Sequence, residues 1–124
     1  MASRNCRKVY VVEDDDAVRD STRAVLESLG FDVSEYASAV DFLTAVSRPL
    51  GGCVLLDLHM PGMSGLELLE LIRRRGWDLP AIIVTGRSDE LLKARAGHAG
   101  IVTFLTKPIE EATLVQALDN AFSS

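Results

Sequence analysis

The chain has no long hydrophobic run, only two cysteines, and few aromatic residues (one Trp, two Tyr and four Phe). No uninterrupted apolar stretch approaches the roughly 20 residues that a membrane-spanning helix needs, so we expect no membrane segment. The residues before the first apolar run, Met1 to Lys8, lack the apolar core of a signal peptide. These absences favour a cytoplasmic protein.

Basic charge is also in deficit, with 13 Lys and Arg against 18 Asp and Glu and a net charge of −5. Because a nucleic-acid-binding domain presents a basic face, we do not expect this domain to bind nucleic acid by itself. Cys6 lies near the terminus and Cys53 within an apolar run, which does not favour a disulfide framework. The 124 residues, 48% of them apolar, are typical of one domain over 1–124 with its own core.

Short apolar runs typical of strands alternate along the chain with helical patterns. We expect strands at 9–12, 31–36, 53–56, 81–84 and 101–105. We expect helices at 18–29, 38–46, 64–72, about 89–96 and 109–122. Strict alternation predicts an α/β fold: a doubly wound parallel sheet of five strands with five helices on its two faces.

Local signals mark several helix ends. Ser38 is a candidate N-cap, and Ser64 with Glu67 forms a capping-box pattern. The second helix is expected to carry its apolar face on Val40, Phe42, Leu43 and Val46. The helix at 89–96 is the weakest, because it has few large apolar residues and Gly97 follows it closely.

Polar residues follow four of the expected strands. Glu13 and Asp14 follow the first, Asp57 the third, Thr85 the fourth and Lys107 the fifth. Open parallel sheets place their sites at the carboxyl ends of strands. The pattern therefore predicts a cation site beside a carboxylate that can accept a phosphoryl group.

The acids after the first strand form a row, Glu13 to Asp16. Two like charges about 4 Å apart repel by about 4 kcal/mol at an effective dielectric constant near 20, so a cluster that includes Asp57 must bind a cation or keep a proton. Carboxylate oxygens suit Mg²⁺ or Mn²⁺. In the alternative interpretation the row caps the first helix and its charges are solvated. Both interpretations hold if Glu13 and Asp14 face the site and Asp15 or Asp16 serves the helix start.

Asp57 interrupts an apolar strand and begins the loop 57–65, which we expect to leave its carboxylate open to solvent. Such a carboxylate can act as a nucleophile and form an aspartyl phosphate. The alternatives are a turn residue for Asp57, a strand residue for Thr85 and a solvated surface side chain for Lys107. We favour the functional interpretation because phosphoryl transfer needs positioning and charge neutralisation together.

Four motifs carry a family resemblance, at 11–15 (VVEDD), 57–65 (DLHMPGMSG), 84–86 (VTG) and 104–108 (FLTKP). The spacings fit as well, with 43 residues from Asp14 to Asp57, 28 more to Thr85 and 22 more to Lys107. From about Val9 to Phe122, the chain resembles the receiver domain of two-component response regulators, and most closely the FixJ branch. The resemblance implies a flavodoxin-like fold with strand order 2-1-3-4-5.

The resemblance also implies roles for the site residues. Asp57 would accept a phosphoryl group from a sensor histidine kinase or a phosphotransfer protein. Asp14 and Asp57 would bind Mg²⁺ directly, Glu13 through water, and His59 through its backbone carbonyl. Mn²⁺ would be an alternative ion.

Further implied roles concern the switch. Lys107 would pair with a phosphate oxygen, Thr85 would turn to hydrogen-bond the phosphoryl group, and Phe104 would rotate inward, although plain core packing is the alternative for Phe104. Lys107–Pro108 is a candidate cis peptide. The surface of the fourth helix, fifth strand and fifth helix would signal to an effector domain or partner, with a phosphorylation-dependent homodimer as one outcome.

Several features depart from the family pattern: Glu13 replaces the commoner Asp, Thr103 stands where an acid is frequent, and residues 96–100 are rich in glycine. The resemblance implies a switch that catalyses only its own phosphorylation and dephosphorylation, with no effector domain in these residues. One alternative is a pseudo-receiver that binds partners without phosphorylation. Another is a haloacid-dehalogenase-type phosphatase, which needs a second Asp where this chain has His59.

Overall fold

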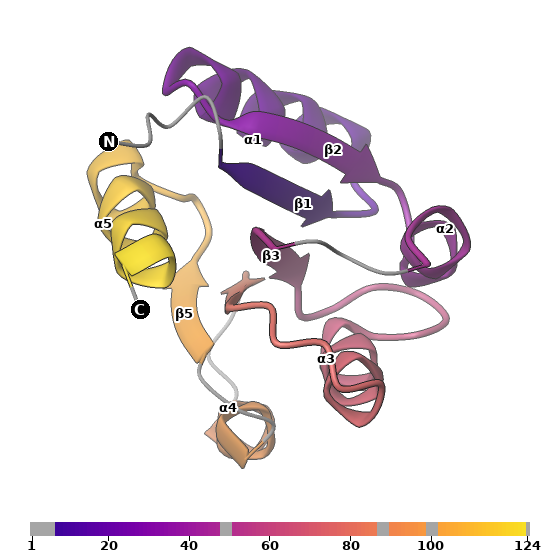
Figure 1. The fold of residues 1–124 in the computed structure, drawn as a ribbon. Helices are drawn as coiled ribbons and strands as arrows, with labels where there is room; N and C mark the ends of the chain where they lie inside the picture. The colour runs from indigo at the N-terminus through magenta and orange to yellow at the C-terminus, as the bar shows by residue number, and fades with distance from the viewer. Residues whose placement is uncertain (1–6, 48–50, 87–89, 99–101, 124) are drawn as a thin grey trace.

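The computed structural model describes residues 7–47, 51–86, 90–98 and 102–123. Within these ranges strands and helices alternate strictly along the chain (Figure 1). The strands are β1 (Lys8–Val12), β2 (Asp32–Tyr36), β3 (Cys53–Asp57), β4 (Ala81–Thr85) and β5 (Val102–Thr106). The helices are α1 (Asp16–Ser28), α2 (Ala39–Ala45), α3 (Gly65–Arg74), α4 (Glu90–His98) and α5 (Glu111–Ser123).

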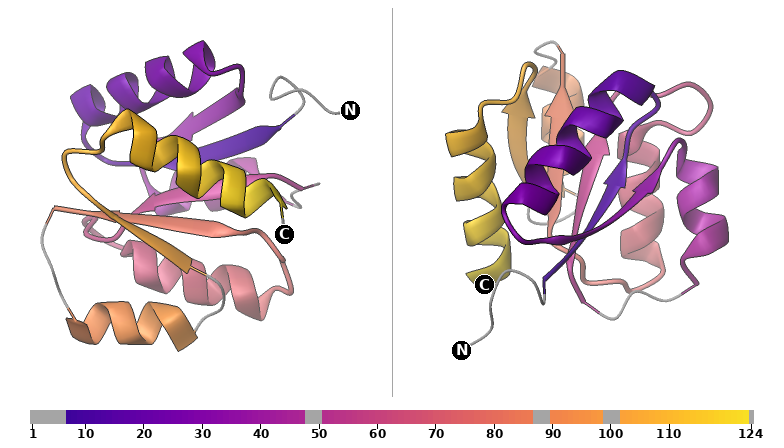
Figure 2. Two further views of the ribbon diagram at one scale, coloured as in Figure 1. Left: turned by 90° about the vertical axis from the view of Figure 1, so that its left-hand side faces the viewer. Right: turned by 90° about the horizontal axis from the view of Figure 1, so that it is seen from above.

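The strands form one parallel sheet in the order β2-β1-β3-β4-β5. This confirms the α/β class, the parallel sheet and the strand order. Helices α1 and α5 lie on one face and α2 and α3 on the other (Figure 2). Every residue of β3 and β4 is buried, as expected for inner strands covered on both faces.

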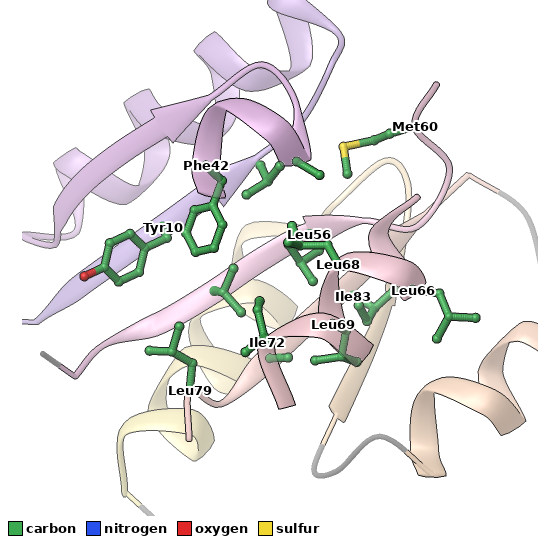
Figure 3. Packing of buried hydrophobic residues seen from close by; sticks show 14 of the residues in the cluster. Tyr10, Phe42, Leu56, Met60, Leu66, Leu68, Leu69, Ile72, Leu79 and Ile83 are labelled. Carbon is green, nitrogen blue, oxygen red and sulfur yellow. The ribbon is translucent and has the colours of Figure 1, made fainter. Parts of the chain in front are cut away.

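Two apolar clusters flank the sheet, because successive strand residues point to opposite faces. Val9 and Val11 of β1 join the cluster under α1 and α5, whereas Tyr10 and Val12 join the cluster under α2 and α3. Phe42 of α2 is fully buried in the second cluster, where its ring points toward β1 and β3 (Figure 3). Its centroid lies 5.7 Å from that of Tyr10, in an edge-to-face arrangement.

The helix starts agree with the sequence signals. Asp15 caps α1 and Ser38 caps α2, each accepting from the backbone N–H three residues later at 3.0 Å. Ser64 and Glu67 form the full capping box at the start of α3. Of the two interpretations of the acidic row, Asp15 therefore serves the helix start.

Two expectations about helices were wrong. Val40 is 61% exposed, since α2 has only two turns and its narrow buried face is carried by neighbours such as Phe42. Helix α4 continues to His98 rather than ending near Ala96, because a glycine such as Gly97 weakens a helix without ending it. The expected start at Asp89 lies outside the described residues.

No helix in the described part of the chain is both long and apolar enough to cross a membrane.

Candidate cation and phosphoryl-acceptor site

Three carboxylates converge at the carboxyl edge of the sheet. Glu13 and Asp14 follow β1, and Asp57 is the last residue of the adjacent strand β3. Each offers an oxygen within 4.8 Å of the other two. Glu13 and Asp57 are buried, whereas Asp14 is exposed. The parallel pairing of β1 with β3 thus brings Asp57 together with acids that lie 43 and 44 residues before it.

The expectation of an open Asp57 carboxylate was wrong, because its side chain is only 7% exposed. The backbone N–H of His59 donates to Oδ1 at 3.2 Å, and Lys107 Nζ lies 3.3 Å from Oδ2. The chain after β3 folds back tightly, so the N–H of Gly65 donates to the carbonyl of Leu58 at 3.1 Å. Each carboxylate oxygen of Asp57 thus has a partner within a buried position.

Sequence reasoning missed the part that Gly65 plays in this turn. A Cβ at residue 65 would lie only 2.2 Å from the carbonyl oxygen of Asp57, so only glycine allows α3 to start so close to the strand end. The signal was present in the sequence, since a glycine directly after the N-cap Ser64 is not required by the helix itself.

Lys107 bridges the two buried acids. Its Nζ lies 2.9 Å from Glu13 Oε1 and 3.3 Å from Asp57 Oδ2. Its backbone N–H donates to the carbonyl of Thr85 at 2.9 Å, and the peptide bond to Pro108 is cis, as expected. Partial burial lowers the pKa of Lys107, but the hydrogen bond to Glu13 and the charge of Asp57 outweigh it and raise that pKa. The lysine is thereby held charged beside Asp57.

Burial raises the pKa of Glu13, although the hydrogen bonds from Lys107 and from the Asp15 backbone act in the opposite direction and Asp57 adds repulsion. The site therefore holds more negative charge than one lysine neutralises. All three clustered side chains offer carboxylate oxygens, the ligands that Mg²⁺ and Mn²⁺ prefer. The residues present fit a hard divalent cation.

The structure places the other two candidates on the neighbouring strands. Thr85 is buried at the end of β4, in register with Thr106 of β5. Phe104 is partly buried and packs against the cluster under α2 and α3. This position agrees with core packing in the conformer described, and the inward rotation of Phe104 stays a prediction.

This chain belongs to the response regulator receiver domain family, whose sequence pattern matches residues 9–119. It is 42% identical over 110 residues to the transcriptional regulatory protein FixJ of Azorhizobium caulinodans, covering 89% of this chain and 52% of that protein. It is 36% identical over 110 residues to the response regulator protein TodT of Pseudomonas putida, covering 89% and 48%. The chain thus spans about half the length of these curated relatives.

Solved structures agree with this assignment. The crystal structure of FixJ-N superimposes with a TM-score of 0.87 at 34% identity, over 94% of each chain. The response regulator StyR gives a TM-score of 0.87 at 38% identity, over 94% of this chain and 59% of that one. The likeness to the FixJ branch inferred from the motifs is confirmed.

Proposed function

We propose that the domain is a phosphorylation-controlled switch in which Asp57 accepts a phosphoryl group from a phosphohistidine of a sensor histidine kinase or a phosphotransfer protein. The observation that carries the proposal is the arrangement around Asp57. Its carboxylate lies among two further acids and a lysine, at the sheet edge where parallel α/β proteins bind ligands.

The transfer is a displacement at phosphorus. A carboxylate oxygen of Asp57 forms a bond to phosphorus as the bond from phosphorus to the imidazole nitrogen breaks, and that nitrogen retains the bonding electron pair. In dephosphorylation, an oxygen of water forms a bond to phosphorus as the bond from phosphorus to the Asp57 oxygen breaks. Inorganic phosphate leaves, and the Asp57 carboxylate is restored. Each step needs in-line positioning and neutralised charge, so the protein acts mainly through geometry and electrostatics.

We assign the cation site to the same acids. Asp14 and Asp57 would hold Mg²⁺, or Mn²⁺, directly, with Glu13 acting through water and His59 through its backbone carbonyl. A bound ion supplies positive charge beside the phosphoryl oxygens. Exposed Asp14 lies on the solvent side of the cluster, which gives a cation a route of entry.

Lys107 and Thr85 would respond to the new group. A phosphoryl group adds roughly 1.5 to 2 negative charges, so Lys107 gains from exchanging one carboxylate contact for a phosphoryl oxygen. Thr85 would donate a hydrogen bond to the same group, with Phe104 turning inward behind it. A bias of about 1–3 kcal/mol between two conformers changes their ratio by about 5- to 150-fold.

The altered surface would comprise α4, β5 and α5, and would act on an effector domain or a separate partner. Relatives named as transcriptional regulators favour control of transcription as the output. With a net charge of −5, the domain itself is not expected to contact nucleic acid. We also propose that phosphorylation favours a homodimer of the domain and that the protein is located in the cytoplasm.

Incubation with acetyl phosphate and Mg²⁺, followed by intact-protein mass spectrometry, tests the proposal. We expect one phosphoryl adduct in the wild type, none in Asp57→Asn, and an unchanged adduct in the exposed control Asp20→Asn. A folded wild type that takes up Mg²⁺ without an adduct would instead favour the pseudo-receiver. Steady turnover of many phosphoesters would favour a phosphatase, despite His59 where that family needs its second Asp.

A further inference from the structure

Arg19 of α1 contacts the backbone of the acidic loop, residues 13–15, which joins β1 to α1. Its Nη1 donates to the carbonyl oxygen of Glu13 at 2.9 Å, and its Nη2 pairs with Asp16. The side chain of Arg19 is only 14% exposed, whereas that of Asp16 is 86% exposed. One planar guanidinium thus links the end of β1 to the start of α1.

The i,i+3 pair with Asp16 does not explain why Arg19 is partly buried, because Asp16 itself is exposed. Arg19 is the fourth residue of α1, near the end of the helix where the dipole favours negative side chains over positive ones. A cation close to the acids also opposes the binding of a divalent ion. The hydrogen bond to Glu13 is the contact that accounts for a partly buried arginine here.

With this bond, every polar group of Glu13 has a partner. Its N–H donates to the carbonyl of Tyr36, its Oε2 accepts from the Asp15 backbone, and its Oε1 pairs with Lys107. Arg19 supplies the fourth contact, to the carbonyl oxygen. That oxygen belongs to the Glu13–Asp14 peptide, and because a peptide unit is planar, holding the oxygen fixes the plane from which Asp14 projects.

We propose that Arg19 is a positioning residue that fixes the Glu13–Asp14 peptide and so directs the exposed Asp14 carboxylate toward the divalent cation. The inference depends on the proposed function, because it assigns the cation site to Glu13, Asp14 and Asp57. Asp16 offsets the charge of Arg19, which lets the guanidinium act as a donor without adding its full positive charge to the site.

Arg23, one turn along α1, provides a matched control. It pairs with Glu27 at 3.2 Å and with Glu35 at 3.1 Å, and neither of these contacts is with residues 13–16. Arg19→Gln and Arg23→Gln each remove one positive charge from the same helix. If charge alone mattered, both variants would bind Mg²⁺ at least as tightly as the wild type. The increase in Mg²⁺ affinity would then be larger in Arg19→Gln.

The first measurement is the Mg²⁺ dissociation constant of the full chain, by isothermal titration calorimetry. We expect Arg19→Gln to weaken binding about tenfold, the usual effect of losing a partner that orients a ligand, while Arg23→Gln binds at least as tightly as the wild type. Equal or tighter binding by Arg19→Gln would overturn the inference. If Arg19→Gln does not fold, Arg19→Lys keeps the charge and is expected to bind several-fold more weakly than the wild type.

The second measurement needs no metal. Amide and carbonyl NMR shifts of Glu13, Asp14 and Asp15 in the metal-free protein should change in Arg19→Gln and stay in place in Arg23→Gln. Unchanged loop shifts in Arg19→Gln would overturn the inference even where the wild type binds Mg²⁺. A wild type that takes up no Mg²⁺ contradicts both the proposed cation site and the direction of Asp14 toward it, whereas a failure confined to Arg19→Gln leaves the proposed function intact.

Discussion

Lys107 lies closer to Glu13 than to Asp57, with Nζ 2.9 Å from Glu13 Oε1 and 3.3 Å from Asp57 Oδ2. The single ammonium therefore neutralises part of both buried carboxylates at once. A divalent cation at the same acids would compete with this ammonium for the same negative charge. Metal binding and the Lys107 contacts would thus be coupled, with measurable consequences.

Lys107→Gln is expected to tighten Mg²⁺ binding while slowing phosphorylation of Asp57. Removing the competing charge favours the cation by about tenfold, the equivalent of about 1.4 kcal/mol. The lost donor to the phosphoryl oxygen slows transfer. Calorimetry measures the first effect and the rate of adduct formation from acetyl phosphate measures the second. Weaker Mg²⁺ binding in a folded Lys107→Gln variant would contradict the competition.

Glu13→Gln is expected to stabilise the metal-free protein at neutral pH. Because burial raises the pKa of Glu13 above its reference value of 4.5, folding favours the protonated form. Protonated Glu13 therefore stabilises the folded state relative to the unfolded state. This contribution to the free energy of unfolding is fully present below pH 4.5 and is lost as the pH rises through the folded pKa. Glutamine stays neutral throughout, so its advantage should be present at pH 7 and should disappear below pH 4.5.

Urea unfolding with a chelator present, from pH 4 to pH 7, measures this difference, with exposed Asp20→Asn as the control. Added Mg²⁺ should stabilise the wild type more than Glu13→Gln, because a ligand stabilises the state that binds it. A Glu13→Gln variant that is less stable at pH 7 would mean that the ion pair with Lys107 outweighs the cost of burying the carboxylate.

Strand positions were predictable from sequence because inner parallel strands are continuous apolar runs that end at polar residues. The run before Asp57 and the run before Thr85 show this pattern, and the site follows because parallel strands end at one edge. The convergence of Glu13, Asp14 and Asp57 was predictable for the same reason.

Tertiary contacts explain what the sequence did not predict. The burial of Asp57 depends on the close return of the chain at Gly65 and on Lys107, 50 residues away. The contact of Arg19 with Glu13 was missed since its acceptor is a backbone carbonyl, for which a sequence carries no residue-type signal. The exposure of Val40 depends on how a two-turn helix lies on the sheet, which periodicity alone does not determine.

Cys53 is expected to resist alkylation in the folded protein. It is fully buried in β3, and burial raises the pKa of its thiol to about 12, so little reactive thiolate forms at pH 8. In a Cys6→Ser background, labelling by iodoacetamide should be at least about a thousandfold slower than in denaturant, because it requires unfolding. Mass spectrometry follows the reaction, and labelling at nearly the denatured rate would contradict the buried position.

Gly65→Ala is expected to destabilise the fold and to impair phosphorylation of Asp57. The added Cβ would lie 2.2 Å from the Asp57 carbonyl oxygen, so the start of α3 or the end of β3 must move, at a cost of about 2–3 kcal/mol. Gly97→Ala in α4 is the control, since its Cβ meets nothing within 4 Å and should stabilise the helix by about 0.5–1 kcal/mol. Urea unfolding measures both changes. A Gly65→Ala variant as stable and as readily phosphorylated as the wild type would contradict the close approach of α3 to β3.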